Sequence, residues 1–227
     1  MTFPFPFVPA RTKPFPDVIS TNSGGDTAIN ASKSITLPSG IVAGDLILLC
    51  LAGYADGGPI VNTPSGFTPL GVNDGTRTYV RYAFKRAVGT ESGTSVTVAS
   101  GAGNFFLGWT AHNIRGAADP VISGNASGTS GAPDCPSFSP SGGAGQILWV
   151  ACADAYGLTQ TQSAPSGYSG YVVGAANASG VDYARMNTAW RKVNTATENP
   201  PAYPNAILTS GVTSPQWLAD TIAIYPA

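Results

Sequence analysis

Charged residues and histidine are scarce in this sequence. Asp, Glu, Lys and Arg make up only 10% of the 227 residues, whereas about a quarter of the residues in ordinary globular domains are charged. Long amphipathic helices need a charged face, so this scarcity disfavours them. The one histidine, His112, leaves catalytic triads and histidine-based metal clusters short of members. A net charge of −1 without a run of Lys or Arg argues against nucleic acid or an anionic membrane surface as a partner.

Long apolar runs are also missing. The longest, residues 46–52, is far shorter than the ~20 residues that a membrane-spanning helix needs. Aromatic residues and prolines stand at the N-terminus, where a secretion signal would have a cationic start and an apolar helix. We therefore expect no membrane anchor and no secretion signal.

Glycine and proline are abundant instead, with 28 and 19 residues respectively. They separate short segments rich in β-branched and aromatic residues, a pattern typical of strands joined by turns. A chain of this length can bury a substantial core, and sandwiches of similar size often form one domain. The sequence therefore predicts an all-β, antiparallel β-sandwich. Its expected strands cover residues 34–37, 45–52, 78–87, 95–99, 105–114, 146–153, 168–173, 183–193, 206–209 and 217–225.

A set of motifs occurs twice along the chain. The copies are residues 39–49 and 141–150, the turns Pro64-Ser-Gly-Phe67 and Pro165-Ser-Gly-Tyr168, and residues 83–87 and 189–193. The first two motifs keep the same separation in both copies, which chance rarely produces, and the third has a slightly larger one. We therefore expect two related halves of one β-structure. In the turns, we expect proline at the second place of a type I turn and glycine at the fourth.

Two segments, residues 46–51 and 147–153, are apolar at nearly every position. Such strands are typically covered on both faces. One cover would be the sandwich core, and the other a loop, the N-terminal segment or a partner.

The three cysteines, Cys50, Cys135 and Cys152, cannot all pair within one chain. The repeat aligns Cys50 with Ala151 rather than with Cys152, so the two thiols are expected at strand positions that face opposite ways. We therefore expect no Cys50–Cys152 bridge, and buried, reduced thiols. Cys135 is expected to be exposed, with an intermolecular bridge as the alternative.

Residues 1–33 are predicted to be an extended N-terminal arm and its lead-in. Four phenylalanines alternate with prolines there, and proline fixes φ and removes a backbone donor. Such a stretch does not form a helix or an interior strand. It could pack on its own domain, lie across a neighbouring subunit or be disordered. The predicted partner-binding residues are Phe3, Phe5, Phe7 and Phe15.

The repeated motifs resemble those of two-repeat, jelly-roll-like β-sandwich structural proteins of tailed bacteriophages. The resemblance covers residues 34–227 and is carried by Leu37-Pro-Ser-Gly40, residues 43–47, the Pro-Ser-Gly-aromatic turn and the aromatic-Lys strand. The second copy departs from the pattern, with Gln146 where the first has Asp45 and Ser169-Gly170 where the first has Thr68-Pro69.

The resemblance implies one jelly-roll-like sandwich domain with a first repeat over about 34–120 and a second over about 136–227. It also implies a virion component assembled in the bacterial host cytoplasm. This component would be a capsid decoration (cement) protein that binds and stabilises the assembled shell, or alternatively a carbohydrate-binding or receptor-binding module of a tail or fibre. The implied partners are the major capsid protein and other copies of the chain, in a homo-oligomer or a lattice. No catalytic residue is carried over.

Candidate catalytic and metal-binding residues are few. His112 is interpreted as a structural histidine on a strand, and no Cys-x-x-Cys, Gly-x-Gly-x-x-Gly or P-loop motif is present. Asp154 could form a glycosidase pair with Asp56 or Asp182, but a solvated loop carboxylate is the preferred interpretation. Calcium bound by loop oxygens is an alternative. We expect no enzyme, no cofactor and no metal site.

Three tyrosines, Tyr54, Tyr156 and Tyr171, are expected in loops. Exposed rings of this kind stack on sugars in carbohydrate-binding modules. Scattered surface tyrosines are the preferred interpretation.

Overall fold

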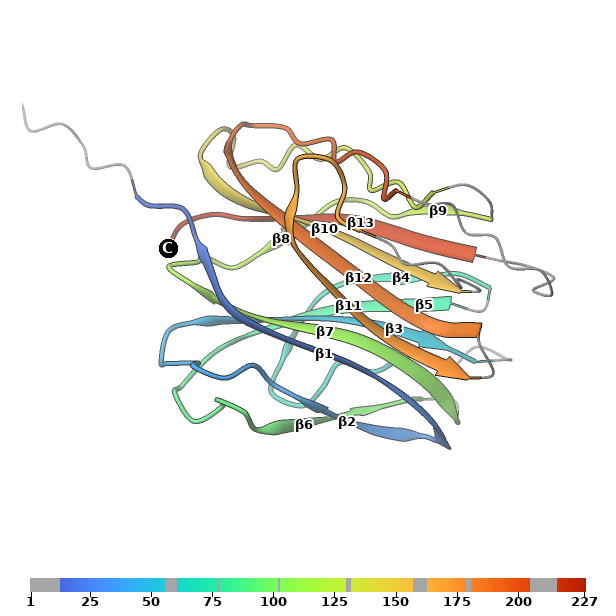
Figure 1. Ribbon diagram of the computed structural model, residues 1–227. Coiled ribbons are helices and arrows are strands. Elements are labelled where there is room, and N and C mark those ends of the chain that lie inside the picture. Colours follow the sequence, from blue (N-terminus) through green and yellow to red (C-terminus); the bar gives the residue numbers. More distant parts are fainter. Residues whose placement is uncertain are drawn as a thin grey trace, which may run out of the picture.

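The structure is a computed structural model that describes residues 13–55, 61–76, 78–101, 103–129, 132–156, 163–178, 181–204 and 216–227. The regular structure of these residues consists of β-strands in antiparallel pairs (Figure 1). The prediction of an all-β protein with antiparallel sheets is therefore confirmed. Among the described residues, no helix is long and apolar enough to cross a membrane.

The first large sheet has the strand order β1-β7-β3-β5-β4. Its strands are β1 (Asp17–Asn30), β7 (Phe105–Arg115), β3 (Leu46–Tyr54), β5 (Thr78–Arg86) and β4 (Thr68–Asp74). The second large sheet has the order β11-β12-β10-β13-β8, and β9 also pairs with β13. Its strands are β11 (Ser169–Ala178), β12 (Val181–Asn194), β10 (Gln146–Tyr156), β13 (Gln216–Ile224), β8 (Val121–Ile122) and β9 (Ala126–Gly128). A small sheet pairs β2 (Ser32–Thr36) with β6 (Ser95–Ala99).

Four strands follow the same order in both large sheets. In the first sheet the order is β7-β3-β5-β4, and in the second it is β13-β10-β12-β11. In each set the strand that comes first in the chain lies between the third and the fourth, and the second pairs with the third.

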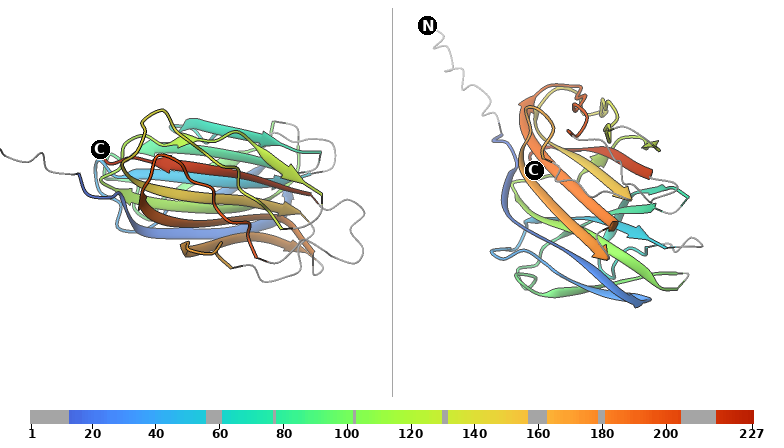
Figure 2. Two further views of the ribbon diagram at one scale, coloured as in Figure 1. Left: turned by 90° about the horizontal axis from the view of Figure 1, so that it is seen from above. Right: turned by 45° about the vertical axis from the view of Figure 1, so that its right-hand side comes forward.

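The two large sheets pack face to face (Figure 2). Alternate residues of β3, from Leu46 to Ala52, point into the space between the sheets, where they meet Leu148, Val150 and Cys152 of β10. This inner core also includes Val80, Tyr82, Ile114, Met186, Leu218, Ile222 and Ile224.

The outer faces of both large sheets are covered by described parts of the same chain. Ile35 of β2 and Val98 of β6 pack on the outer face of the first sheet. Cys135 and Tyr203 pack on the outer face of the second sheet. All nine residues of β3 are buried, as expected for a strand covered on both sides. The outer covers are the small sheet and two loop segments.

The sandwich is closed along one edge by a close approach of backbones. A Cβ atom on Gly174 of β11 would lie 1.9 Å from the carbonyl oxygen of Trp109, and one on Gly25 of β1 would lie 1.8 Å from that of Ala175. Only glycine leaves room for backbones to come this close.

Strand β1 was not among the expected strands, because residues 17–33 were assigned to the arm and its lead-in. Its central sequence, Ser20-Thr-Asn-Ser-Gly-Gly25, lacks the alternation of apolar and polar residues that marks a strand. Its backbone is held by pairing with β7, from Asp17 opposite Arg115 to Asn30 opposite Phe105. The expected strand over 206–209 lies outside the described residues.

The two Pro-Ser-Gly-aromatic turns differ from the expected geometry. The backbone N–H of Phe67 donates to the carbonyl of Pro64 over 3.1 Å, and that of Tyr168 donates to Pro165 over 3.0 Å. Proline is therefore at the first place and glycine at the third. The third place requires glycine because its φ is positive, +80° at Gly66 and +78° at Gly167.

Candidate functional site

The predicted partner-binding segment leads into one corner of the sandwich. Phe3, Phe5 and Phe7 lie outside the described residues, whereas Phe15 is half-buried just before β1. The ammonium group of Lys192 on β12 contacts the Asp17 carboxylate over 2.5 Å at the start of β1. The start of β1 and the last described residues lie at the same end of the sandwich (Figure 1).

A surface pocket of about 240 Å³ lies at this end. We call the pocket together with Phe15 the N-terminal corner. The pocket is formed where β10 begins and β12 ends, beside the described C-terminal residues. Its lining residues are Lys13, Ala144, Gly145, Gln146, Asn194 and Pro226. The hydroxyl of Tyr225 donates to the carbonyl of Gly143 over 2.9 Å and holds the neighbouring loop.

Inside the sandwich, six polar or sulfur-containing residues face one another across the two sheets. In the first sheet, Cys50 pairs with Tyr82 on one side and Thr110 on the other. In the second sheet, Cys152 pairs with Asp220 and Thr188 in the same way. We call these six residues the central row.

Each residue of the central row contacts its counterpart in the other sheet. The Tyr82 hydroxyl donates to Asp220 Oδ2 over 3.0 Å, and the Thr188 hydroxyl donates to Thr110 Oγ1 over 3.3 Å. Between these two hydrogen bonds, the Sγ atoms of Cys50 and Cys152 lie 3.9 Å apart. The two sheets are therefore joined by three neighbouring contacts at one level of the core.

The structure overturns two expectations about the cysteines. Cys50 and Cys152 face each other instead of pointing in opposite directions, because β10 is shifted by one residue relative to the motif alignment. The Ile147 N–H donates to the carbonyl of Gly145 over 2.9 Å in a tight turn, so Leu148, not Ile147, occupies the inner face together with Leu46. Cys135 is 1% exposed rather than at the surface. The three thiols are buried and free.

His112 lies on β7, beside the central row and buried as expected of a structural histidine. Its Nε2 atom is 3.2 Å from Thr110 Oγ1 and 3.1 Å from Thr188 Oγ1. Its ring meets that of Trp190 edge to face, with centroids 5.6 Å apart. The sheets enclose this histidine away from solvent.

Asp154 is not the solvated loop carboxylate that was expected. Strand β10 continues to Tyr156, so Asp154 is a strand residue with 0% exposure. Its Oδ1 atom accepts the backbone N–H of Arg185 over 3.3 Å. Burial raises the pKa of this carboxyl well above its usual value. Its proposed pairing partners, Asp56 and the side chain of Asp182, lie outside the described residues.

Asp220 was missed by the sequence analysis. Its carboxylate accepts hydrogen bonds from Tyr82 and, over 3.3 Å, from the Asn73 side-chain amide. Burial raises its pKa to about 7, against the opposing effect of these two donors. The sequence did contain a signal for a buried acid. Asp220 lies two residues from both Leu218 and Ile222, so it is on the same, core-facing side of the strand.

Two further glutamates are held at matching places after β5 and β12. Glu91 contacts Lys85 Nζ over 2.9 Å and accepts the backbone N–H groups of Val88, Gly89 and Thr90. Despite desolvation, these donors lower its pKa to about 2. Glu198 pairs with Arg191 and accepts the Tyr168 hydroxyl over 3.1 Å. Both carboxylates therefore stabilise the loops that follow these two strands.

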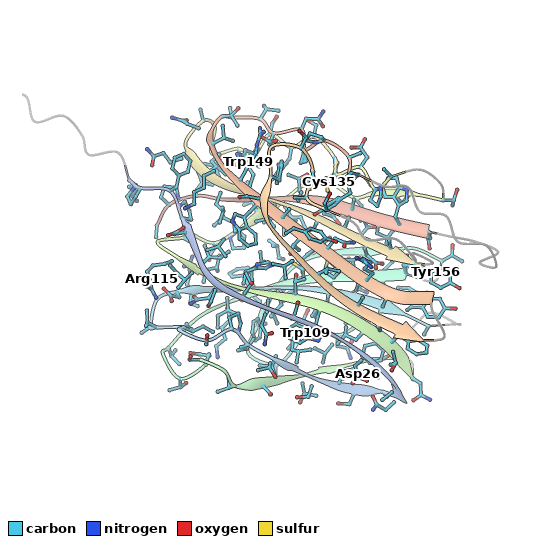
Figure 3. The ribbon with its side chains drawn as sticks, viewed as in Figure 1. Asp26, Trp109, Arg115, Cys135, Trp149 and Tyr156 are labelled. Carbon is cyan, nitrogen blue, oxygen red and sulfur yellow. The ribbon has the colours of Figure 1, made fainter. Side chains whose placement is uncertain are left out.

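Tyr54, Tyr156 and Tyr171 are strand residues of β3, β10 and β11 rather than loop residues as expected, and they do not form an exposed platform. Tyr54 and Tyr156 are buried and stack on each other with centroids 4.5 Å apart and planes 8° apart. The half-buried Tyr171 donates its hydroxyl to Asn187 Oδ1 over 2.7 Å. Figure 3 shows Tyr156 at the end of the sandwich opposite Arg115, far from the N-terminal corner.

No group of three or more His, Cys, Asp or Glu side chains in the described ranges is placed to hold a metal ion. No family model, curated protein or solved structure matches this chain.

Proposed function

We propose that this chain is a bacteriophage capsid decoration (cement) protein, a structural component that binds and stabilises the assembled shell. The observation that carries the proposal is the cover of both sheets. On each outer face, described residues such as Ile35 and Tyr203 form a buried cluster, and the proposal assigns Phe3, Phe5 and Phe7 to a partner instead. Three phenylalanines among prolines are then available to bury against a partner.

The two-repeat, jelly-roll-like architecture is part of this proposal. It is supported by the shared strand order of the two sheets, by the two matching turns and by the Lys85–Glu91 and Arg191–Glu198 pairs. Two copies of one unit that share a core give a rigid body suited to holding a position in a lattice.

The attachment site of the proposal is the N-terminal arm together with the N-terminal corner. Phenylalanine burial contributes ~25 cal/mol per Å², and the intervening prolines lose little freedom on docking because φ is already restricted. The proposed partners are the major capsid protein and neighbouring copies of the chain, without nucleic acid or membrane. The proposed location is the virion.

A non-enzymatic role is supported by the state of the acidic residues. Asp154 and Asp220 are 0% exposed between the sheets, and Glu91 and Glu198 are tied to cations and loop donors. All four carboxylates are buried among the described residues.

The test is a variant in which Phe3, Phe5 and Phe7 are replaced by serine, added to shells that lack the protein. We expect a folded sandwich with an unchanged melting temperature and shell affinity lower by a factor of about 100 or more. The matched control replaces Val42, Val72 and Val88, which are 48%, 51% and 69% exposed, by serine and should bind normally. Full affinity of the folded phenylalanine variant would remove the arm as the anchor. If the variant fails to fold, the arm packs on its own sandwich and not on a partner.

A further inference from the structure

We propose that Cys50 and Cys152 form a disulfide that joins the two sheets when the folded protein meets an oxidising environment. The inference goes beyond the proposed attachment function and does not depend on it. It rests on the central row, where the two sulfur atoms already lie 3.9 Å apart.

The hydrogen bonds on both sides keep the two thiols together. Tyr82–Asp220 and Thr110–Thr188 are contacts between the same two sheets, each one strand away from the cysteines. Sliding one sheet over the other would break both hydrogen bonds inside the core, where unpaired polar groups are costly. The proximity of the sulfurs is therefore fixed by the fold. An S–S bond is about 2 Å long, so side-chain rotation and a small local shift must close the remaining gap.

The surroundings assign different roles to the two thiols. Burial disfavours the thiolate at both positions, but at Cys50 hydrogen bonding with Cys152 and His112 outweighs burial and lowers the pKa. Burial and the neighbouring Cys50 raise the pKa of Cys152. Since the thiolate is the nucleophile in exchange reactions, Cys50 attacks first.

The oxidant is a small-molecule disulfide such as oxidised glutathione. The Cys50 thiolate attacks one sulfur of the oxidant and releases the first glutathione, which takes up the proton lost by Cys50. Cys152 then loses its proton and attacks the Cys50 sulfur, and the second glutathione leaves with that proton. The two thiols of the protein are oxidised, and the oxidant is reduced to two thiols. Because both cysteines are 0% exposed, the first attack requires transient opening of the sheets.

Cys135 provides an internal control. Its Sγ atom donates to the carbonyl of Cys152 over 3.3 Å, but it belongs to the cluster on the outer face of the second sheet. Burial raises its pKa beyond the physiological range. The backbone of β10 lies between Cys135 and the other two thiols, so Cys135 is excluded from the bridge.

The experiment incubates the full chain with oxidised glutathione, both folded and during refolding, and measures intact mass and cross-linked peptides. We expect the product to be lighter by two hydrogens, with the Cys50 and Cys152 peptides joined. It should melt about 10 °C above the reduced protein, reversibly on reduction. Cys135→Ala should behave in the same way, whereas Cys50→Ala and Cys152→Ala should form no internal bridge. Three free thiols under both conditions, a bridge to Cys135, or only glutathione adducts would overturn the proposal.

Discussion

The side chain of Asp220 occupies a position that favours its protonated form. Its pKa rises from 3.8 to about 7 between the sheets, so the folded protein keeps a proton that the unfolded chain has released above pH 4. The free energy of unfolding should therefore fall as the pH rises from about 4 to 7. Over that range the loss from this group amounts to about 4 kcal/mol.

Asp220→Asn should remove this loss, because an amide does not titrate. The amide oxygen can still accept the Tyr82 hydroxyl, so the hydrogen bond between the sheets is kept. We expect the variant to be more stable than the wild type at pH 8 and similar to it at pH 4, as measured by urea unfolding at both values. A slope of the same sign should remain, since burial also raises the pKa of Asp154. A variant that is less stable than the wild type at both pH values would contradict the assignment.

Glu91 has the opposite pH behaviour. Its pKa is lowered from 4.5 to about 2, so its contribution to stability is present above pH 4.5 and is lost as the pH falls toward 2. Glu91→Gln should lower the free energy of unfolding at pH 7 by about 2 kcal/mol, because three loop N–H groups and Lys85 lose a charged acceptor. The difference from the wild type should shrink on acidification. Equal stability at pH 7 would show that the loop does not need this carboxylate.

Strands β1 and β11 can approach neighbouring backbone closely because glycines at the contact have no side chain. Gly174→Ala places a methyl group 1.9 Å from the carbonyl oxygen of Trp109, and the obstacle is backbone that cannot rotate away. We expect a loss of roughly 3 kcal/mol or more, since overpacking in a tight core costs 1–3 kcal/mol even where side chains can adjust. Gly124→Ala is the control for glycine replacement, because a Cβ atom there meets nothing within 4 Å and its φ is not in the left-handed region. Equal melting temperatures for the two variants would argue against the close approach.

The same strands explain which parts of the fold could be predicted from the sequence. The apolar runs of β3 and β10 identify strands covered on both faces, and their residues bear this out. Strand β1 escapes detection because the glycines needed at the closed edge remove the pattern that marks a strand. The facing cysteines escape detection because β10 is shifted by one residue relative to the motif alignment, which reverses the side that each residue of β10 faces. Neither effect changes the composition, so only the three-dimensional structure reveals it.

At the scale of the whole molecule, the two halves share one core. Leu46 and Leu48 of the first half pack with Leu148 and Val150 of the second, so neither half can bury its inner face alone. We expect residues 1–120 and 132–227, produced separately, to lack cooperative melting transitions and to regain one when mixed. Circular dichroism during heating measures this directly. Independent cooperative folding of either fragment would contradict a common core.

One long edge of the sandwich is closed, and a side-chain hydrogen bond occupies a strand carbonyl at the other, which affects how copies behave when they are crowded. The edge strands β1 and β11 lie against each other. On the opposite side the Asn125 amide donates to the carbonyl of Val72 in β4 over 3.0 Å. Exposed strand edges are the usual starting points for fibre formation. On the proposed shell, neighbouring copies could therefore stand at very high local density without recruiting one another into amyloid-like aggregates.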